Sequence, residues 1–197
     1  MDSRFTTLQK FYQKYWPDIT ESQIQKMAGF ITMRTFKKGE IWLSPGEVCD
    51  FIGIINYGII RYYTVAEKKE HIGQIYFEHQ AVTDYSSYFT GKPARIFMDA
   101  VKETEVAIIY KNDLKKLIDE DFVYQKMMFD YLSITYINNF ERTVSLQLDS
   151  AETRYLKLLT ARPEIIQKVP LYMVASYLGI TPEALSRVRS KIAHTGA

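Results

Sequence analysis

An acidic, a hydroxyl and a basic residue stand at helical spacing near the C-terminal end of the sequence. They are Glu183, Ser186 and Arg187, at positions i, i+3 and i+4, so on a helix they share one face. An arginine can donate two hydrogen bonds to O6 and N7 of a guanine, and a glutamate can accept one from N4 of a cytosine. These residue types at this spacing predict a face that reads DNA bases.

Two short helices joined by a tight turn would hold that face in place. Ala175 provides the small residue needed where two helices cross closely, and Gly179 provides a turn residue that tolerates a positive φ angle. Thr181 is expected to cap the second helix, with Pro182 at its first position. Apolar residues then occupy the inward positions: Val174, Leu178, Ile180, Leu185 and Val188. The pattern is typical of a DNA-binding helix-turn-helix with a recognition helix over residues 182–193, and a helical hairpin within a core is the alternative interpretation.

Basic residues are concentrated in the same segment. No acidic residue follows Glu183, whereas Arg187, Arg189 and Lys191 do, and the whole chain carries a formal net charge of only +2. A local positive field of this kind can neutralise DNA phosphates. We expect Thr181, Arg189 and Lys191 to belong to the DNA-binding surface, with Arg189 and Lys191 toward the phosphates. A solvated basic helix end, favoured by the helix dipole, is the alternative.

The composition bears on the class of protein. With 197 residues, 47% of them hydrophobic, the chain can form one medium-sized domain and a small one. It has no apolar signal segment and no run of about 18 apolar residues, which predicts a cytoplasmic protein without a membrane partner. Cys49 is the single cysteine, so an iron–sulfur cluster is not expected. The sequence contains no P-loop or common hydrolase motif, and we do not expect an enzyme.

Three segments with different periodicity follow one another along the chain. Residues 1–35 have a helical pattern, and residues 20–23 have the pattern of a capping box. Residues 36–110 contain short runs of β-branched and aromatic residues separated by glycine and proline, which predicts an antiparallel sandwich, roll or barrel. From Asn112 onward the pattern is helical again. The predicted fold class is therefore α+β, with a β-domain and its N-terminal helices at residues 1–121, a long helix at 122–149 and a helix-turn-helix domain at 150–197.

One predicted helix is unusually long, since residues 122–148 would extend about 40 Å at 1.5 Å per residue. Six of its residues alternate spacings of three and four, which is the heptad pattern of a helix pair. They are Phe129, Leu132, Tyr136, Asn139, Thr143 and Leu146. We expect this stripe to form a homodimer, because one helix-turn-helix reads only a few base pairs and a dimer reads two half-sites. The alternative is that the stripe packs across the chain's own β-domain.

This order of elements resembles the Crp/Fnr family of bacterial transcription regulators over nearly the whole chain. The glycine-containing turns of residues 38–40, 45–47 and 57–61 are similar to those of the family's cyclic-nucleotide-binding jelly roll. Residues 179–187 are similar to its recognition segment, in which the residues matched by Glu183 and Arg187 contact bases and Ser186 matches a further contact. The resemblance implies a homodimeric regulator that binds double-stranded DNA, with RNA polymerase as a candidate partner. Relatives often continue into a β-hairpin wing, which we do not expect in full here.

The family's cyclic-nucleotide pocket corresponds to residues 82–97. In the family an acidic residue of this segment binds the ribose, and an Arg-Ser or Arg-Thr pair binds the cyclic phosphate. Asp84 falls on the acidic residue and Ala94 on the arginine. Without that arginine we expect that cAMP is not bound in the usual way and that any small-molecule effector is a different one. The residues expected around this pocket are Thr83, Asp84, Tyr85, Arg95 and Asn139.

A second interpretation belongs to another class of function. In it the β-domain binds a cyclic nucleotide or another small ligand and acts through protein contacts, without DNA. Salt distinguishes the two, because sequence-specific DNA binding weakens steeply as salt rises and the ligand-binding module has no such affinity to lose.

Overall fold

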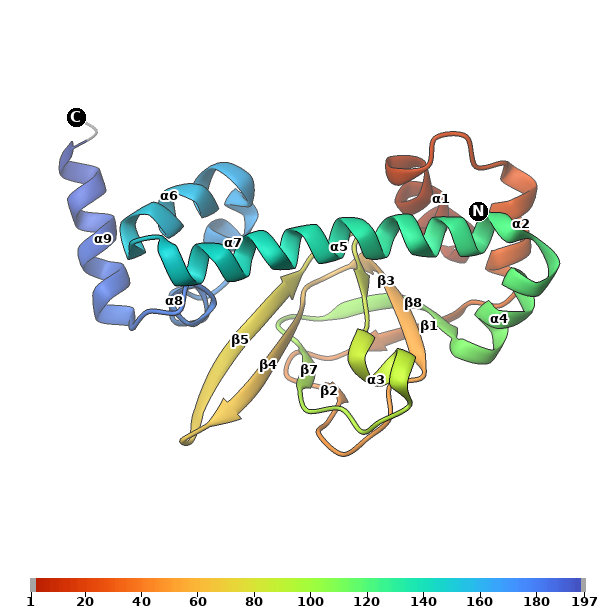
Figure 1. Ribbon diagram of the computed structural model, residues 1–197, viewed down its shortest axis with the longest axis horizontal. Coiled ribbons are helices and arrows are strands. Elements are labelled where there is room, and N and C mark those ends of the chain that lie inside the picture. Colours follow the sequence, from red (N-terminus) through yellow and green to blue (C-terminus); the bar gives the residue numbers. More distant parts are fainter. Residues whose placement is uncertain (1–2, 196–197) are drawn as a thin grey trace. The chain divides into compact units, whose positions relative to one another are not determined.

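The computed structural model describes residues 3–195 and has mixed helical and antiparallel β structure, as the sequence predicted (Figure 1). The helices are α1 (Ser3–Tyr15), α2 (Glu21–Ala28), α3 (Tyr85–Thr90), α4 (Lys111–Glu120), α5 (Phe122–Leu148), α6 (Ala151–Ala161), α7 (Pro163–Lys168), α8 (Leu171–Tyr177) and α9 (Pro182–Thr195). The strands are β1 (Thr32–Phe36), β2 (Ile41–Leu43), β3 (Phe51–Tyr57), β4 (Ile60–Ala66), β5 (Lys69–Tyr76), β6 (Ala81–Val82), β7 (Phe97–Ala100) and β8 (Thr104–Tyr110).

The chain forms two compact units. The first comprises Met1–Tyr63 and Ile75–Leu132, and the second comprises Thr64–Gln74 and Ser133–Ala197. The division falls inside α5, whose observed limits match the predicted long helix. The domain limits that the sequence suggested, at either end of this helix, remain a prediction.

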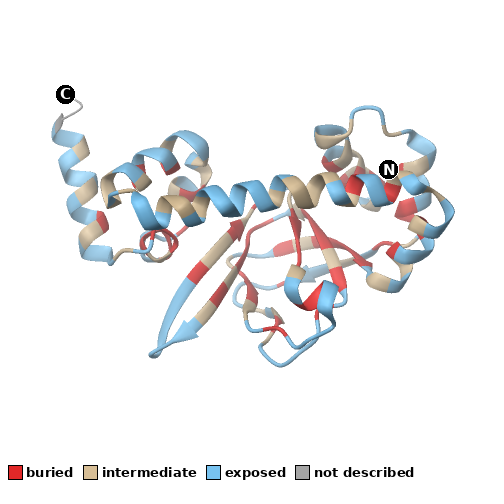
Figure 2. Ribbon diagram, viewed as in Figure 1, coloured by how far each residue is buried: buried red, intermediate tan, exposed pale blue. Residues whose placement is uncertain are grey.

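Within the described part of the chain, the strands form two four-stranded antiparallel sheets, in the orders β1-β8-β3-β6 and β2-β7-β4-β5. Alternate residues of β8 serve two different cores. Val106 and Ile108 pack in the core between the sheets, whereas Ala107 and Ile109 pack in a core with α1, α2, α4 and the start of α5. Because both faces of this strand are covered, it reads in the sequence as an almost continuous apolar run. Figure 2 colours the residues of the strands by their burial.

One segment differs from the prediction. Residues 32–35, expected to be helical, belong to strand β1, which pairs with β8 from Thr32↔Ile108 to Phe36↔Thr104. The partner strand is distant in sequence, and its hydrogen bonds outweigh the weak local helical preference. The capping box of α2 is confirmed, because the Gln23 amide donates to Thr20 Oγ1 at 3.3 Å and the Thr20 amide donates to Gln23 Oε1 at 3.0 Å.

Gly58 closes the turn between β3 and β4 in a conformation that side chains avoid. Its φ is +111°, and a Cβ atom at this position would lie 2.5 Å from the Cα of Thr104. We expect Gly58→Ala to lower the free energy of unfolding by about 2 kcal/mol or more, because backbone strain and a steric clash add together. The matched control is Gly39→Ala, where φ is +78° and no described atom lies within 4 Å, so that strain alone costs about 1 kcal/mol. Equal losses for the two variants in urea unfolding would contradict this account.

The second unit contains the outer part of the β4–β5 hairpin, the second half of α5 and helices α6 to α9. Helix α9 packs against both α6 and α8. The buried side chains include Tyr155 and Leu158 of α6, Ile165 of α7 and Val174 of α8. Among residues 3–195, no helix is both long and apolar enough to cross a membrane.

Candidate nucleic-acid interface

A tight turn joins α8 to α9. Gly179 has a positive φ of +68°. Its amide donates to the carbonyl of Ser176 at 3.0 Å, and the amide of Ile180 donates to the carbonyl of Ala175 at 3.0 Å. This pair of hydrogen bonds is a Schellman motif, which ends a helix and redirects the chain through a left-handed residue. Ala175 is fully buried, as expected for the residue at which the two helices cross. The predicted turn is therefore confirmed.

Thr181 begins the second helix. Its Oγ1 accepts a hydrogen bond from the amide of Ala184 at 3.2 Å, and its carbonyl accepts one from the amide of Leu185 at 3.0 Å. Pro182 occupies the first helical position, where its missing amide hydrogen costs nothing. Helix α9 thus begins where the sequence predicted and ends slightly later, at Thr195.

The predicted base-reading side chains share the exposed side of α9. Glu183, Ser186 and Arg187 are all exposed, whereas Leu185 is only 2% exposed and Val188 is half-buried. Figure 2 shows the open surface of this helix. The helix therefore uses one face for packing and leaves the polar face accessible to a partner.

The carboxylate of Glu183 is held in its ionised form. Its pKa is lowered chiefly by a hydrogen bond from its own backbone amide, and further by the hydroxyl of Thr181 and the charge of Arg187. The N-terminus of a helix also favours a negative charge. Because an ionised carboxylate can only accept hydrogen bonds, any group that it binds must be a donor, as N4 of cytosine is.

The two basic residues expected to contact phosphates differ in their surroundings. Arg189 is exposed and borders an open depression that Tyr155 of α6 also lines. Lys191 is already in an ion pair, its Nζ lying 2.5 Å from Oε2 of Glu152 on α6. A phosphate would have to compete with that carboxylate, so we expect Lys191 to bind phosphate less readily than the sequence alone suggested. Exposed pairs of this kind are worth little, and the competition is modest.

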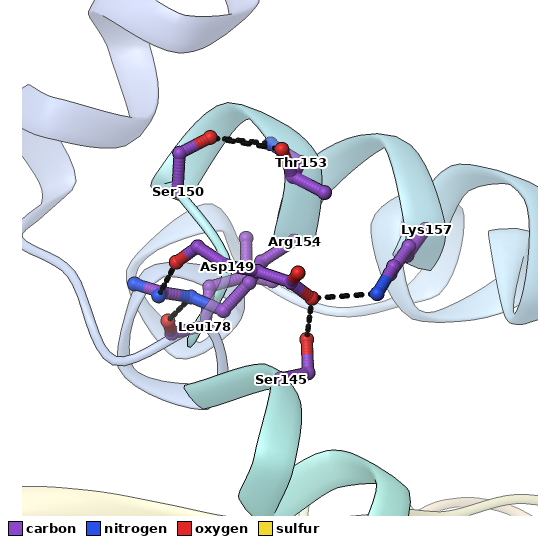
Figure 3. Close-up of polar contacts among 7 residues, drawn as sticks. All are labelled: Ser145, Asp149, Ser150, Thr153, Arg154, Lys157 and Leu178. Carbon is purple, nitrogen blue, oxygen red and sulfur yellow. Dashed lines mark hydrogen bonds and ion pairs between the residues drawn. The ribbon is translucent and has the colours of Figure 1, made fainter. Parts of the chain in front are cut away.

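A polar network fixes the joint between α5 and α6 (Figure 3). Asp149 accepts hydrogen bonds from Lys157 Nζ at 2.7 Å and Ser145 Oγ at 2.5 Å, and these two bonds lower the pKa of its carboxyl group. Arg154 donates from Nη1 to the carbonyl of Asp149 at 2.7 Å and from Nε to the carbonyl of Leu178 at 2.9 Å. The network ties the end of α5 to α6 and to the turn that precedes α9. The sequence did not point to these residues, since their partners lie on three different elements.

The outer part of the β4–β5 hairpin is bonded to α8. Ser176 Oγ donates to the carbonyl of Glu70 at 2.9 Å and accepts from the amide of Ile72 at 3.0 Å. Arg142 of α5 donates to the carbonyl of Tyr177 at 2.7 Å, and its guanidinium lies 3.9 Å from the centroid of the Tyr177 ring. Within the second unit, helix α8 is therefore held by both the hairpin and α5. No local pattern in the sequence predicted either contact.

The stripe on α5 that the heptad pattern selected is unevenly exposed. Phe129 and Tyr136 are 67% and 71% exposed. Leu132, by contrast, is half-buried and lines an apolar cavity in the first unit. Ile137 and Phe140, which the heptad pattern left out, are 57% and 54% exposed. The exposed apolar face of α5 thus includes Ile137 and Phe140, whereas Leu132 contributes little to it.

The polar and C-terminal members of the stripe are used within the second unit. Asn139 is exposed, and its Oδ1 accepts a long hydrogen bond of 3.4 Å from Nε2 of Gln74. Thr143 is also exposed, and its hydroxyl donates to the carbonyl of Asn139 at 2.9 Å. Leu146 is 39% exposed and faces the turn, where a Cβ on Gly179 would lie 3.2 Å from its Cδ2 atom. The role of these residues in a dimer stays a prediction.

The fold itself uses the residues matched to the start of the nucleotide pocket. Asp84 is the N-cap of α3, and its Oδ1 accepts from the amides of Ser86 at 3.0 Å and Ser87 at 3.2 Å. Thr83 is buried, and its hydroxyl donates to the carbonyl of Phe51 at 2.7 Å. A carboxylate engaged as a helix cap, next to a buried threonine in place of glycine, is poorly prepared to bind a ribose.

The phosphate end of the matched segment is also altered. Ala94 is 4% exposed and belongs to the core between the sheets, whereas Arg95 is exposed at the surface. Arg61 is buried, and two hydrogen bonds of 2.7 and 2.8 Å join its guanidinium to Asp99. The charge of Arg61 is therefore already balanced. Tyr85, the remaining pocket residue of the first unit, is half-buried and lines the cavity beside α5.

We expect cAMP to bind with a dissociation constant well above 1 μM, which corresponds to a binding free energy weaker than about −8 kcal/mol. A cyclic phosphate without its arginine loses a charge-assisted hydrogen-bonded pair worth about 1.5–3 kcal/mol, or one to two decades of affinity. Isothermal titration calorimetry of the full chain provides the measurement. A dissociation constant at or below about 1 μM would mean that Arg95 or another basic residue reaches the phosphate.

A two-sheet β structure, a long helix and a helix-turn-helix in this order define the fold of the Crp/Fnr transcription regulators. Similar solved structures include FixK2 from Bradyrhizobium japonicum, at 18% sequence identity and a TM-score of 0.72, with 84% of this chain and 86% of that chain covered. The c-di-GMP responsive global regulator CLP from Xanthomonas campestris is similar at 15% identity and a TM-score of 0.70, covering 90% of this chain and 93% of CLP. A structure described as a crp/fnr-family regulator from Eubacterium rectale has 16% identity and a TM-score of 0.69, with 94% and 88% covered.

These likenesses confirm the predicted fold. No protein-family model matches the sequence, and no curated protein matches it. At such low identities the likeness concerns the course of the backbone, and the roles of individual side chains have to be argued from this chain.

Proposed function

We propose that this chain is a sequence-specific DNA-binding transcription regulator of the Crp/Fnr type. The observation that carries the proposal is the α8–Gly179–α9 module, which leaves Glu183, Ser186 and Arg187 exposed on one face of a capped helix. The chemistry of these side chains matches the edges of base pairs in the major groove. The chain has no proposed catalytic role, and we expect it in the cytoplasm.

In the proposed complex α9 enters the major groove. Arg187 donates two hydrogen bonds to a guanine, and the ionised Glu183 accepts one from a cytosine. Ser186 lies between them on the same face and can contact either kind of base. Arg189 and Thr181 flank this face toward the phosphates, and Lys191 joins them when a phosphate displaces Glu152.

We further propose that the regulator is a homodimer that pairs through α5. Tyr136, Ile137 and Phe140 are each more than half exposed on this helix, which is unusual for large apolar side chains in a monomer. A twofold dimer would present two copies of α9 to a pseudo-palindromic operator, with half-sites about one helical turn apart.

The β-domain is proposed to receive a small-molecule effector other than cAMP. Ala94 at the phosphate position and Asp84 as a helix cap support this view. RNA polymerase is the partner proposed for the DNA-bound state.

Selection of bound duplexes from a random pool tests the proposal. We expect enrichment of a pseudo-palindromic sequence, followed by an affinity for it that falls steeply with salt, because phosphate contacts release counterions. A chain that acts only as a ligand-binding module would enrich no sequence, and that result would contradict the proposal.

A further inference from the structure

The helical side of the first unit contains an apolar cavity, to which Tyr85 and Leu132 contribute. Its volume is about 60 Å³, and its lining comes from α1 to α5 and the neighbouring strands. The side chains that matter most for its chemistry are Leu8, Met27, Ala81, Met127, Met128 and Tyr131. All of them belong to the same compact unit, so the cavity does not depend on the second unit.

Its size and lining determine what it can hold. Protein interiors rarely contain voids larger than a water molecule, and a water needs about 10–15 Å³ together with two to four polar partners. This cavity of about 60 Å³ exceeds that size, but its lining is almost wholly apolar. An apolar cavity of about 150 Å³ is known to stay dry and to bind benzene or xenon. A cavity less than half as large suits an uncharged apolar molecule of only a few heavy atoms.

Tyrosine hydroxyl groups supply most of the polar atoms near the cavity. Two of them are occupied by backbone, since the Tyr124 hydroxyl donates to the carbonyl of Gln23 at 2.9 Å and the Tyr131 hydroxyl accepts from the amide of Ala81 at 3.0 Å. Tyr12 also lines the cavity, and burial, followed by the neighbouring Tyr124, raises the pKa of its phenol. A neutral phenol can offer one hydrogen bond to a ligand. Neither an anion nor a cation would find a balancing charge among these lining residues.

We propose that this cavity is a binding site for a small, uncharged, apolar molecule with at most one hydrogen-bonding group. Tyr124, Met127, Met128, Tyr131 and Leu132 bring α5 into contact with it, so an occupant would touch the helix that we propose as the dimer contact. The site offers the first unit an effector input that shares Tyr85 with residues 82–97 and otherwise uses different residues. It does not rest on DNA binding, and its test below uses no DNA.

Xenon is a suitable probe because it is apolar, uncharged and enters dry cavities. Methionine-methyl NMR spectra of the full chain would be recorded under increasing xenon pressure. Met27, Met127 and Met128 line the cavity, whereas Met98 lies between the two sheets and Met173 lies in α8. We expect saturable shifts of the three lining methyl groups and unchanged signals for the other two. No response of the lining methyls, or an equal response of all five, would overturn the proposal.

A variant whose cavity is filled by a larger side chain provides the matched test. Ala81→Val adds two carbons to a strand position that lines the cavity, where a β-branched residue is favoured. It should reduce the xenon response at least roughly tenfold, while Ala28→Val, at a buried position of α2 outside the lining, should leave it unchanged. An undiminished response in Ala81→Val would place xenon elsewhere and overturn the assignment.

An enlarged cavity keeps the proposal testable if Ala81→Val does not fold. Leu8→Ala removes a fully buried side chain from the lining and should let benzene shift the same three methyl signals. Absence of any benzene response in the folded Leu8→Ala protein would also count against a site here.

Discussion

Replacing Arg187 with alanine is expected to weaken binding to the selected operator by about 1–3 kcal/mol, or roughly five- to 150-fold, and binding to random DNA far less. Arg187 is exposed on the same face of α9 as Glu183, where a bidentate contact to guanine forms only on the cognate sequence. Leu185, two residues earlier in the sequence, is buried, so the variant removes a surface side chain and leaves the packing intact. Fluorescence anisotropy with operator and random duplexes at one fixed salt concentration gives both affinities.

Lys191→Ala is the matched control on the same helix. A phosphate contact carries no sequence information, so this variant should weaken both duplexes alike and reduce the salt slope by about one at most. The ion pair with Glu152 makes the loss smaller, because Lys191 has to leave that carboxylate before it binds DNA. Should Arg187→Ala weaken operator and random DNA equally, Arg187 contacts a phosphate and the proposed docking is wrong.

The double substitution of Tyr136 and Phe140 by glutamate is expected to convert the proposed dimer into monomers. The two rings stack on the exposed face of α5, with centroids 6.4 Å apart and planes inclined by 21°. In a dimer across this face, four unpaired carboxylates would be buried, and such burial costs several kcal/mol for each group. We expect the dimer to weaken roughly 100-fold or more, and the operator affinity to fall with it. Sedimentation velocity over a range of protein concentrations measures the change.

Asn138→Glu provides the control for added charge on the same helix. Asn138 is exposed and lies two residues from both Tyr136 and Phe140, which places it on the opposite side of the helix. It should leave the dimer intact, and circular dichroism should show equal helix content in both variants. Unchanged dimerisation of the double variant would exclude this face of α5 as the contact.

Several features of the candidate interface were predictable because the bonds that make them are local. Gly179, Thr181 and Pro182 act through hydrogen bonds and φ angles within a few residues of themselves. The capping box of Thr20 and Gln23 is local in the same way. The limits of α5 also follow from its long helical pattern. Local chemistry of this kind is written into short stretches of sequence, whatever the rest of the chain does.

Features that depend on distant partners were not predictable. Residues 32–35 of strand β1 were expected to be helical. Their pairing with β8 was not visible in the local sequence, because β8 lies far along the chain. Lys191 was expected to be free for phosphate, but Glu152 from α6 pairs with it. Asp84 was matched to a sugar-binding acid, yet a carboxylate at that position can equally cap α3, and the folded chain uses it so. In each case one side chain or segment has two compatible partners, and the packing of the whole unit selects between them.

The sequence by itself determined the succession of a helical, a β and a second helical segment, the turn before α9 and the side chains on its outer face. Only the tertiary structure decided which side of α5 remains open. Periodicity selected a stripe through Leu132, but that residue is half-buried and lines the cavity of the first unit, and Ile137 and Phe140 are exposed instead. The apolar pattern of a helix records which positions avoid water, whereas the identity of the surface that covers each one is fixed only when the elements pack.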